Sequence, residues 1–298
     1  MTWVDYLKSS DASEEEREFI LQYGISLERK GFPVILDLNH FAGILNVNVR
    51  SLASAVNSPE HFYRSFSIPK RRAEELRKIV SPYPFLSMVQ TWIKTNILEN
   101  IDVHPNCFSF RKGHSIVNNA AMHLNGFDLY KLDLKDFFPG IPIRRNIKIF
   151  LNCGYSHKVS FFLGALTSYQ NSLPQGAPTS PIISNIIGKK MDNRLHKLSI
   201  SFQLTYSRYA DDITFSGRHI SPRFRNIVKT IIGEEKFEIN FRKEVLISGK
   251  NSKKIVTGIS ISDGHQLKVP REYKRGLKLD VYRLLKFEYK VDPAKTDF

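Results

Sequence analysis

Two adjacent aspartates, in the tetrad Tyr209-Ala210-Asp211-Asp212, are the residues whose type and spacing most clearly indicate chemistry. The tetrad stands between two apolar, strand-forming runs at 202–206 and 213–215, so it is expected at a strand-to-strand turn. Neighbouring carboxylates repel each other, and a fold tolerates such a pair most readily when a divalent cation neutralises it. Carboxylate oxygens suit Mg²⁺, which proteins use to handle phosphates. The tetrad therefore predicts phosphoryl chemistry.

A third carboxylate, Asp133, ends a predicted strand over residues 127–134. Its neighbours Leu132 and Leu134 point to the opposite face of that strand. Placed beside the hairpin, Asp133 completes a set of three carboxylates, which can hold two Mg²⁺ ions about 3.5–4 Å apart. A strand-end aspartate is also a common cap, so Asp133 by itself leaves both interpretations open. Together with Asp211 and Asp212 it predicts a metal site.

A stiff, uncharged loop with the sequence Leu-Pro-Gln-Gly-Ala-Pro-Thr-Ser-Pro occupies residues 173–181. Ser180 and Pro181 at its end are a helix start, with a capping serine and a proline in the first turn. The lack of charge suits a surface that lies against a base or a sugar. A proline-rich turn without function fits these residues equally well.

The composition favours a polyanionic partner. The 298 residues include 44 Lys and Arg against 29 Asp and Glu, a net charge of +15 with an isoelectric point near 9.7. This balance indicates nucleic acid first and a membrane surface second. Residues 1–18 carry six acidic against two basic side chains, whereas residues 218–298 carry 19 basic against 10 acidic ones. The acidity of the first segment predicts a protein contact or a solvated face.

Targeting and redox signals are few. The two cysteines, Cys107 and Cys153, have no paired spacing, which is typical of a reducing cytosol. The N-terminus shows no secretory signal and no apolar run predicts a membrane span. We therefore expect a cytoplasmic protein with no membrane contact.

The remaining pattern predicts an α+β fold, because helices and strands interleave without a strict alternation. Helices are expected through the first sixty residues, with loops near 31–33 and 57–59, and again at 85–100, 222–232 and 271–287. A hairpin is expected over 202–215, and strands near 238–248 and 254–261. The helix at 271–287 is basic and amphipathic.

Five elements in a fixed order resemble the motifs of reverse transcriptases, and two of them resemble elements that mark bacterial retron enzymes. The five are Asn-Ala-x-x-His at 119–123, Leu-Asp-Leu-Lys-Asp-Phe-Phe at 132–138, the Leu-Pro-Gln-Gly string, the Tyr-Ala-Asp-Asp tetrad, and Val-Thr-Gly at 256–258. The resemblance covers roughly residues 60–285. It implies a right-hand polymerase with an N-terminal helical extension (1–60), fingers and palm (61–262, with palm motifs near 127–140 and 200–248) and a short thumb (263–298).

The resemblance also implies roles for individual residues. Catalytic and Mg²⁺-binding roles fall to Asp133, Asp211 and Asp212. Nucleotide-binding roles fall to Lys70, Arg77, Phe138, Gln175, Tyr209 and Lys243. RNA-binding roles fall to Asn119, His123, Val256, Thr257, Gly258, Arg271, Lys274, Arg275 and Lys278.

Among the nucleotide-binding residues, Phe138 corresponds to the steric gate that excludes a ribose 2′-OH, and Lys243 to a proton donor for pyrophosphate. Without the family, Phe138 would be read as a core aromatic and Lys70 and Arg77 as solvated charges. His123 would likewise be read as a core histidine.

The implied activity is RNA-directed DNA synthesis with two Mg²⁺ ions and deoxynucleoside triphosphates. A retron enzyme copies its own structured non-coding RNA, starting from a guanosine 2′-OH, into a branched RNA-linked DNA that serves anti-phage defence with an effector protein. The alternatives are a group II intron-like or other bacterial reverse transcriptase, a metal-dependent nuclease, and a non-catalytic RNA-binding scaffold with the polymerase fold.

Overall fold

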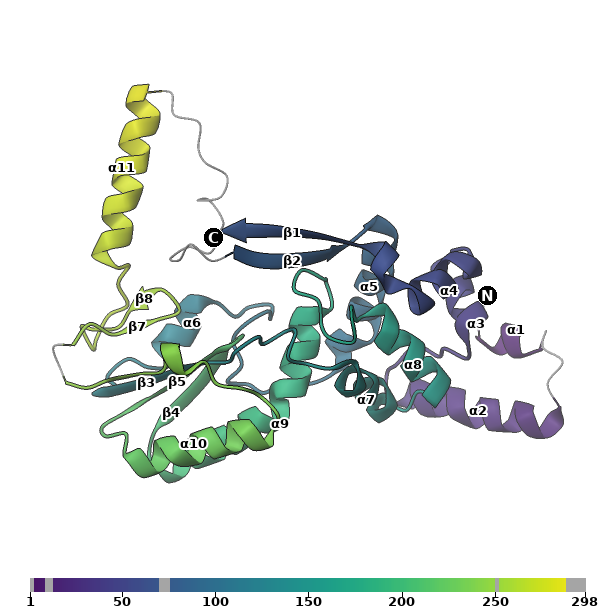
Figure 1. The fold of residues 1–298 in the computed structure, drawn as a ribbon. Coiled ribbons are helices and arrows are strands. Elements are labelled where there is room, and N and C mark those ends of the chain that lie inside the picture. The colour runs from purple at the N-terminus through teal and green to yellow at the C-terminus, as the bar shows by residue number, and fades with distance from the viewer. Residues whose placement is uncertain (1–2, 9–12, 70–75, 250–251, 288–298) are drawn as a thin grey trace. The chain divides into compact units, whose positions relative to one another are not determined.

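A computed structural model describes residues 3–8, 13–69, 76–249 and 252–287 (Figure 1). The chain folds into two compact units, and neither unit is a single stretch of sequence. The first unit comprises residues within 1–68, 78–104 and 136–190, and the second comprises residues within 69–77, 105–135 and 191–298. Residues 1–60 therefore share a unit with later segments, and the boundaries predicted at 60 and 262 do not coincide with those of the two units.

The first unit is mainly helical. Its helices are α1 (Trp3–Lys8), α2 (Glu14–Arg29), α3 (Leu38–Leu45), α4 (Val49–Asn57), α5 (Pro84–Asn96), α7 (Ile143–Cys153) and α8 (His157–Leu166), with short 3-10 helices at Pro59–Phe62 and Leu98–Asn100. Its core includes Phe41, whose ring lies 5.3 Å from that of Trp92 and 5.8 Å from that of Phe162, measured between centroids. Helices through the first sixty residues are thus confirmed.

A two-stranded sheet of β1 (Tyr63–Pro69) and β2 (Leu76–Pro82) adjoins these helices. The loop at 173–181 is attached to it, because the backbone N–H of Val80 donates to the carbonyl of Gln175 at 2.8 Å. Gly176 has a φ of +132°, and a Cβ there would lie 2.9 Å from the carbonyl oxygen of Val80. Only glycine fits this close approach. The helix predicted to start at Ser180 is α9 (Ser180–Ser201), whose first half belongs to the first unit and whose second half belongs to the second.

The second unit is built on an antiparallel sheet with the strand order β4-β5-β3-β6. Its elements are α6 (Ile116–Ala121), β3 (Asp128–Asp133), β4 (Thr205–Tyr209), β5 (Asp212–Gly217), α10 (Pro222–Glu234), a 3-10 helix (Phe241–Lys243), β6 (Val245–Ile247), β7 (Ile255–Val256), β8 (Ile259–Ser260) and α11 (Arg271–Phe287). The strand at 127–134, the hairpin at 202–215 and the helices at 222–232 and 271–287 are confirmed to within a few residues.

Aromatic side chains fill the core between this sheet and α10. Phe215 on β5 lies 5.0 Å from Phe224 on α10 and 5.2 Å from Tyr206 on β4, between ring centroids. The helix begins where Ser221 caps it, accepting from the N–H of Phe224, and Pro222 occupies the first turn. Burying these rings fixes the sheet on which the tetrad lies.

Two predicted strands differ from the structure. Residues 238–248 form only the short strand β6, because the chain turns at Asn240, whose N–H donates to the carbonyl of Asp133 at 2.8 Å. Residues 254–261 form the small hairpin of β7 and β8, because Thr257 and Gly258 have φ of +44° and +84°. Positive φ at both central residues defines a two-residue hairpin turn.

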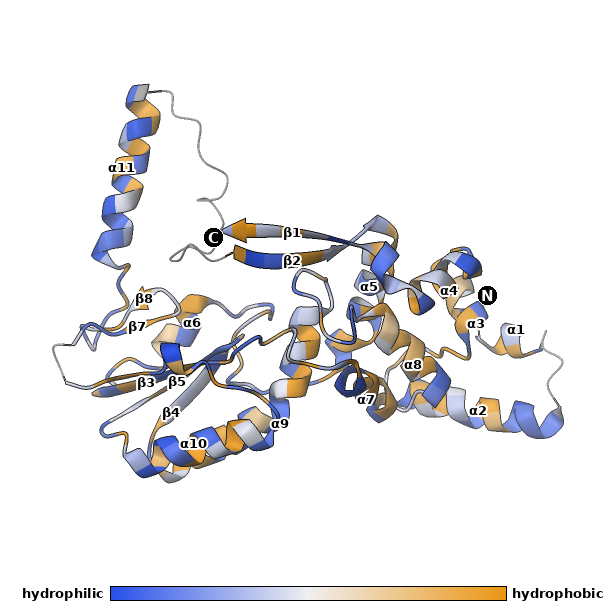
Figure 2. Cartoon of the chain, in the orientation of Figure 1, coloured by the Kyte–Doolittle hydropathy of each residue, from blue (hydrophilic) through white to orange (hydrophobic). Residues whose placement is uncertain are grey.

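The helix α11 has a mixed surface, with hydrophilic and hydrophobic residues alternating along it (Figure 2). Every side chain described on this helix is exposed. In the described part of the chain, no helix combines the length and the apolar character that crossing a bilayer requires.

Candidate active site

The tetrad lies at the turn between β4 and β5, as its flanking sequence predicted. Tyr209 and Asp212 are the last paired residues of the two strands, so Ala210 and Asp211 form the turn itself. Ala210 has a φ of +55°, a left-handed conformation that is uncommon for a residue with a Cβ. The geometry turns the chain sharply and presents two successive carboxylates at one end of the sheet.

The third aspartate lies at the same end of the sheet. In the register of β3 and β5, Asp133 is directly opposite Asp212. The next residue, Leu134, donates its N–H to the carbonyl of Asp211 at 3.0 Å. The structure therefore brings the three predicted carboxylates together within the second unit, on adjacent strands. Directly opposed like charges destabilise a sheet unless a counter-charge is present.

Lys243 is a positive side chain in direct contact with one of the three aspartates. Its Nζ lies 2.8 Å from Oδ2 of Asp133, and the Asn240 side chain donates to Oδ1 of the same carboxylate at 3.2 Å. Lys243 is 61% exposed, whereas Asp133 is 9% exposed. An exposed lysine on a long flexible stem can leave this partner for another anion without disturbing the core.

The pKa values record the crowding of charge. Burial, followed by the charges of Asp212 and Asp133, raises the pKa of Asp211 to about 6. Burial also raises the pKa of Asp212, against the opposing effect of Lys131. For Lys243, burial lowers the pKa, but the hydrogen bond and charge of Asp133 outweigh it and the net shift is upward. A cation at this point would relieve the repulsion between carboxylates, which adds to the effect of burial on the pKa of Asp211.

The donor set suits a divalent metal, although the side chains are not arranged around one. Within the described residues, no group of three or more His, Cys, Asp or Glu side chains could hold a metal ion as it stands. The carboxylate of Asp133 is directed to Lys243 and Asn240 instead. Three carboxylates on neighbouring strands fit a hard cation once Lys243 releases Asp133.

The structure does not place the other predicted nucleotide-binding residues with the aspartates. Phe138 and Gln175 belong to the first unit, whereas the aspartates, Tyr209 and Lys243 belong to the second. Phe138 is half-buried, with its ring 5.3 Å from that of the buried Phe137. Arg77 is exposed on β2, and Lys70 falls outside the described residues. Only the carboxylates, Tyr209 and Lys243 are thus defined as one site.

The Asn-Ala-x-x-His and Val-Thr-Gly elements, far apart in sequence, meet in the second unit. The Asn119 amide donates to Oγ1 of Thr257 at 3.3 Å, and that hydroxyl donates to the carbonyl of Ile116 at 3.1 Å. Ala120 and Val256 share a small core with Leu129 and Ile261. The turn Thr257-Gly258 is therefore fixed against α6.

Asn119, His123 and Val256 require a correction as RNA contacts, because all three side chains are buried. The ring nitrogens of His123 lie 2.7 Å from the hydroxyls of Ser207 and Ser216, one on each side. Burial, with a contribution from the charge of Lys131, lowers the pKa of His123 to about 3. His123 is a neutral core histidine that holds its element on β4 and β5. The basic residues predicted on α11 are exposed, as a nucleic-acid contact requires: Arg271, Lys274, Arg275 and Lys278.

A buried ion pair beneath the tetrad was not predicted. Arg208 and Asp192 are fully buried. Two nitrogens of the guanidinium pair with the two oxygens of the carboxylate. One signal was present in the sequence, because Arg208 shares a strand face with the core residue Tyr206, two positions earlier. A charge on a core-facing position of a strand predicts a buried partner.

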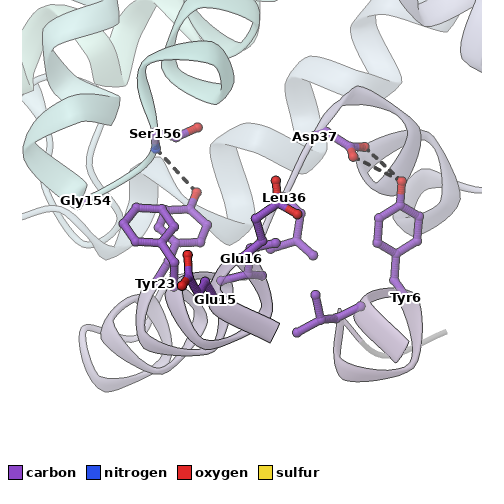
Figure 3. A pocket seen from close by; sticks show the side chains of 11 residues that line it. Tyr6, Glu15, Glu16, Tyr23, Leu36, Asp37, Gly154 and Ser156 are labelled. Carbon is purple, nitrogen blue, oxygen red and sulfur yellow. Dashed lines mark hydrogen bonds between the residues drawn. The ribbon is translucent and has the colours of Figure 1, made fainter. Parts of the chain in front are cut away.

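The first unit contains a pocket of about 790 Å³ that includes none of the predicted site residues (Figure 3). Apolar side chains such as Phe19 and Ile20 line it together with the acids Glu15 and Asp37. Tyr6 bridges to Asp37, with its hydroxyl 3.1 and 3.2 Å from the two carboxylate oxygens. This acidic lining does not suit a nucleoside triphosphate.

Comparison with known proteins identifies the class. A family model described as reverse transcriptase (RNA-dependent DNA polymerase) matches residues 68–281, which include the three aspartates and both retron-like elements. The chain belongs to the reverse transcriptase family, and it is an RNA-directed DNA polymerase with the α+β polymerase fold. Members of this family generally use divalent metal ions.

The relatives define the group within that family. Retron Ec86 reverse transcriptase of Escherichia coli is 32% identical over 261 residues, covering 87% of this chain and 81% of that protein. Retron Mx162 reverse transcriptase of Myxococcus xanthus is 32% identical over 254 residues, covering 74% of this chain and about half (52%) of that protein. A telomerase structure from Candida tropicalis matches with a TM-score of 0.47 and 13% identity, over 70% of this chain and 55% of that one. The chain groups with the bacterial retron reverse transcriptases.

Proposed function

We propose that this enzyme copies its own structured non-coding RNA into a branched, RNA-linked single-stranded DNA. The observation that carries the chemical part is the meeting of Asp133, Asp211 and Asp212 at one end of the sheet. The RNA-specific part is supported by the contact between the Asn119 and Thr257 elements, which fixes an exposed hairpin turn near the sheet. The retron relatives support the same assignment.

In this proposal, the three aspartates would hold two Mg²⁺ ions, which would supply activation of the primer hydroxyl and neutralisation of charge on the phosphates. The aspartates orient the reacting groups in line. Lys243 exchanges its partner, leaving Asp133 for the triphosphate, where its protonated amine can donate to the departing pyrophosphate. We also propose nucleotide-binding roles for Tyr209, Phe138, Gln175, Lys70 and Arg77, with Phe138 excluding a ribose 2′-OH.

The nucleic-acid surface in this proposal includes α11. Its exposed basic side chains would follow the backbone of the RNA–DNA duplex through phosphate contacts. Thr257 and Gly258 would present the hairpin turn to the structured RNA, while Asn119, His123 and Val256 support it from the core. A guanosine 2′-OH of that RNA is the proposed first primer.

The biological setting that we infer is anti-phage defence in the bacterial cytoplasm, with an effector protein as partner. The support is the resemblance to retron enzymes, which the names of the relatives extend only as far as the retron group. The chain's net charge of +15 is consistent with an enzyme that remains bound to its nucleic acid product.

Primer extension on an RNA template with Mg²⁺ and deoxynucleotides tests the catalytic assignment. The double variant Asp211→Asn/Asp212→Asn should reduce extension by at least about 10³-fold, because both substitutions remove metal-binding charge. Asp102→Asn, at an exposed carboxylate in the first unit, is the matched control and should extend like the wild type. Equal extension by the double variant and the control would refute the assignment.

Nucleic acid that co-purifies with the enzyme tests the retron assignment. One structured RNA joined covalently to DNA is the expected species, and a heterogeneous RNA pool would count against it.

Phe138→Ala should increase ribonucleotide incorporation; unchanged sugar selectivity would remove the gate role from Phe138.

A further inference from the structure

Arg208 carries a buried, charged side chain next to the tetrad. It lies on β4, one residue before the tetrad, and its guanidinium is fully buried. A buried guanidinium remains charged and is costly to bury unless its N–H groups all find acceptors. The acceptors of these N–H groups indicate the structural role of Arg208.

Two nitrogens of the guanidinium bind one carboxylate. Nε of Arg208 donates to Oδ1 of Asp192 and Nη2 donates to Oδ2, both at 2.7 Å. The hydroxyl of Tyr206 donates to the same Oδ1 at 2.6 Å. Asp192 lies on α9, also fully buried, so helix and strand are joined by a bidentate pair with a fixed planar geometry.

The third nitrogen of the guanidinium, Nη1, binds the backbone of the tetrad. Nη1 of Arg208 donates to the carbonyl of Ala210 at 3.0 Å, and the N–H of Ala210 donates to Oγ of Ser109 at 2.8 Å. Both polar groups of Ala210 are therefore bound, while its φ of +55° is unfavourable for a residue with a Cβ. A strained turn persists only where its surroundings hold it.

The backbone of Arg208 is bound as well. Its N–H donates to the carbonyl of Asn106 at 2.9 Å, and its carbonyl accepts from the N–H of Phe108 at 2.9 Å. These contacts place Ser109 beside the turn. All of these residues belong to the second unit, the one that contains the three aspartates.

From this arrangement we infer that Asp192 and Arg208 are positioning residues. By fixing the Ala210 peptide, they set the direction of the Asp211 and Asp212 carboxylates. The inference rests on the proposed function, because it assigns the two aspartates to metal binding. The surrounding groups resemble the outer partners of a metal site, whose alteration typically costs 10–100-fold in metal affinity or activity.

Arg208→Lys is the discriminating variant. Lysine keeps the positive charge for Asp192, but a single ammonium cannot reproduce the planar set of bonds to both carboxylate oxygens and to the Ala210 carbonyl. Mn²⁺ binding to the protein alone, followed by electron paramagnetic resonance, should weaken about 10-fold. Primer extension should lose kcat by a similar factor, with the KM for deoxynucleotide unchanged.

Arg194→Lys is the matched control. Arg194 also lies on α9, but its guanidinium donates to Glu234 and Glu235, and this ion pair is partly exposed. It should retain wild-type Mn²⁺ affinity and kcat. Ser109→Ala, which removes the acceptor for the Ala210 N–H together with a contact to the Cys107 thiol, should weaken Mn²⁺ binding by about 3-fold and serves if Arg208→Lys does not fold.

The outcomes separate the two assignments. If Asp211→Asn/Asp212→Asn binds Mn²⁺ like the wild type, the metal site itself is wrong and the proposed function fails. If that double variant loses Mn²⁺ while folded Arg208→Lys and Ser109→Ala bind it normally, the positioning role is refuted and the proposed function stands. A loss of Mn²⁺ affinity in Arg208→Lys or Ser109→Ala, but not in Arg194→Lys, supports the positioning role.

Discussion

Replacing His123 by glutamine should change how the stability of this enzyme depends on pH. The folded protein keeps His123 neutral down to a pKa of about 3, whereas the unfolded chain protonates it near its ordinary value of 6.5. Between those values the unfolded state binds more protons, so stability falls as the pH is lowered. The loss begins below about pH 6.5.

The magnitude follows from the same two values. At its steepest, one such group changes the free energy of unfolding by about 1.4 kcal/mol per pH unit. Between pH 8 and pH 5 the cumulative loss from His123 is about 2 kcal/mol. Burial is the first cause of the shift and the charge of Lys131 the second, so the effect belongs to the closed core around Ser207 and Ser216.

Urea denaturation at pH 8, 7, 6 and 5 measures this dependence, without metal in all samples. The difference between wild type and His123→Gln isolates the one group, because Asp211, with a raised pKa, titrates in both proteins and cancels. His265→Gln, at an exposed histidine, is the control and should follow the wild type. Wild type and His123→Gln curves that run parallel from pH 8 to pH 5 would refute the buried, neutral histidine.

Substitutions at three further positions have expected outcomes. Ala210→Gly should leave the free energy of unfolding within about 1 kcal/mol of wild type, since relief of the left-handed strain offsets the entropy of glycine, whereas Ala210→Val should lower it by more than 1 kcal/mol in urea melts. Lys243→Gln should raise the pKa of Asp211 further in the metal-free protein, measured by carboxyl NMR, because a nearby positive charge is removed. Asp128→Ala should destabilise by about 1–3 kcal/mol in the same melts, because the buried N–H of Ile220 loses its acceptor. A pKa of Asp211 that falls, or an Asp128→Ala protein as stable as the wild type, would contradict the corresponding contact.

The central strands could be predicted from sequence because their signals are local. The run ending at Asp133 and the hairpin around Asp211 each combine apolar alternation with a polar turn, and both lie where the pattern placed them. Register then brought Asp133 opposite Asp212. The sequence predicted Asp133 beside the hairpin, and the sheet supplies the register.

The parts that sequence did not reveal depend on contacts between distant segments. Asp192 lies on a helix with no strong amphipathic pattern, so nothing local marks it as the partner of Arg208. His123 could be read as either a binding or a core residue until Ser207 and Ser216 were seen on both sides of its ring. The division into two discontinuous units likewise follows from packing, which residue patterns do not encode.

The strand order has a consequence for synthesis on the ribosome. Both sheet neighbours of β3 come later in the chain: β5 starts at Asp212, about 80 residues after β3 ends, and β6 later still. Translation adds about 5–20 residues per second, so the strand ending at Asp133 remains without its two partner strands for roughly 4–16 s. During that interval its apolar residues, Leu129 and Leu132 among them, form an open template for wrong pairing. Slow translation or a shortage of chaperones should therefore reduce the yield of this enzyme more than that of a protein whose strands pair as they emerge.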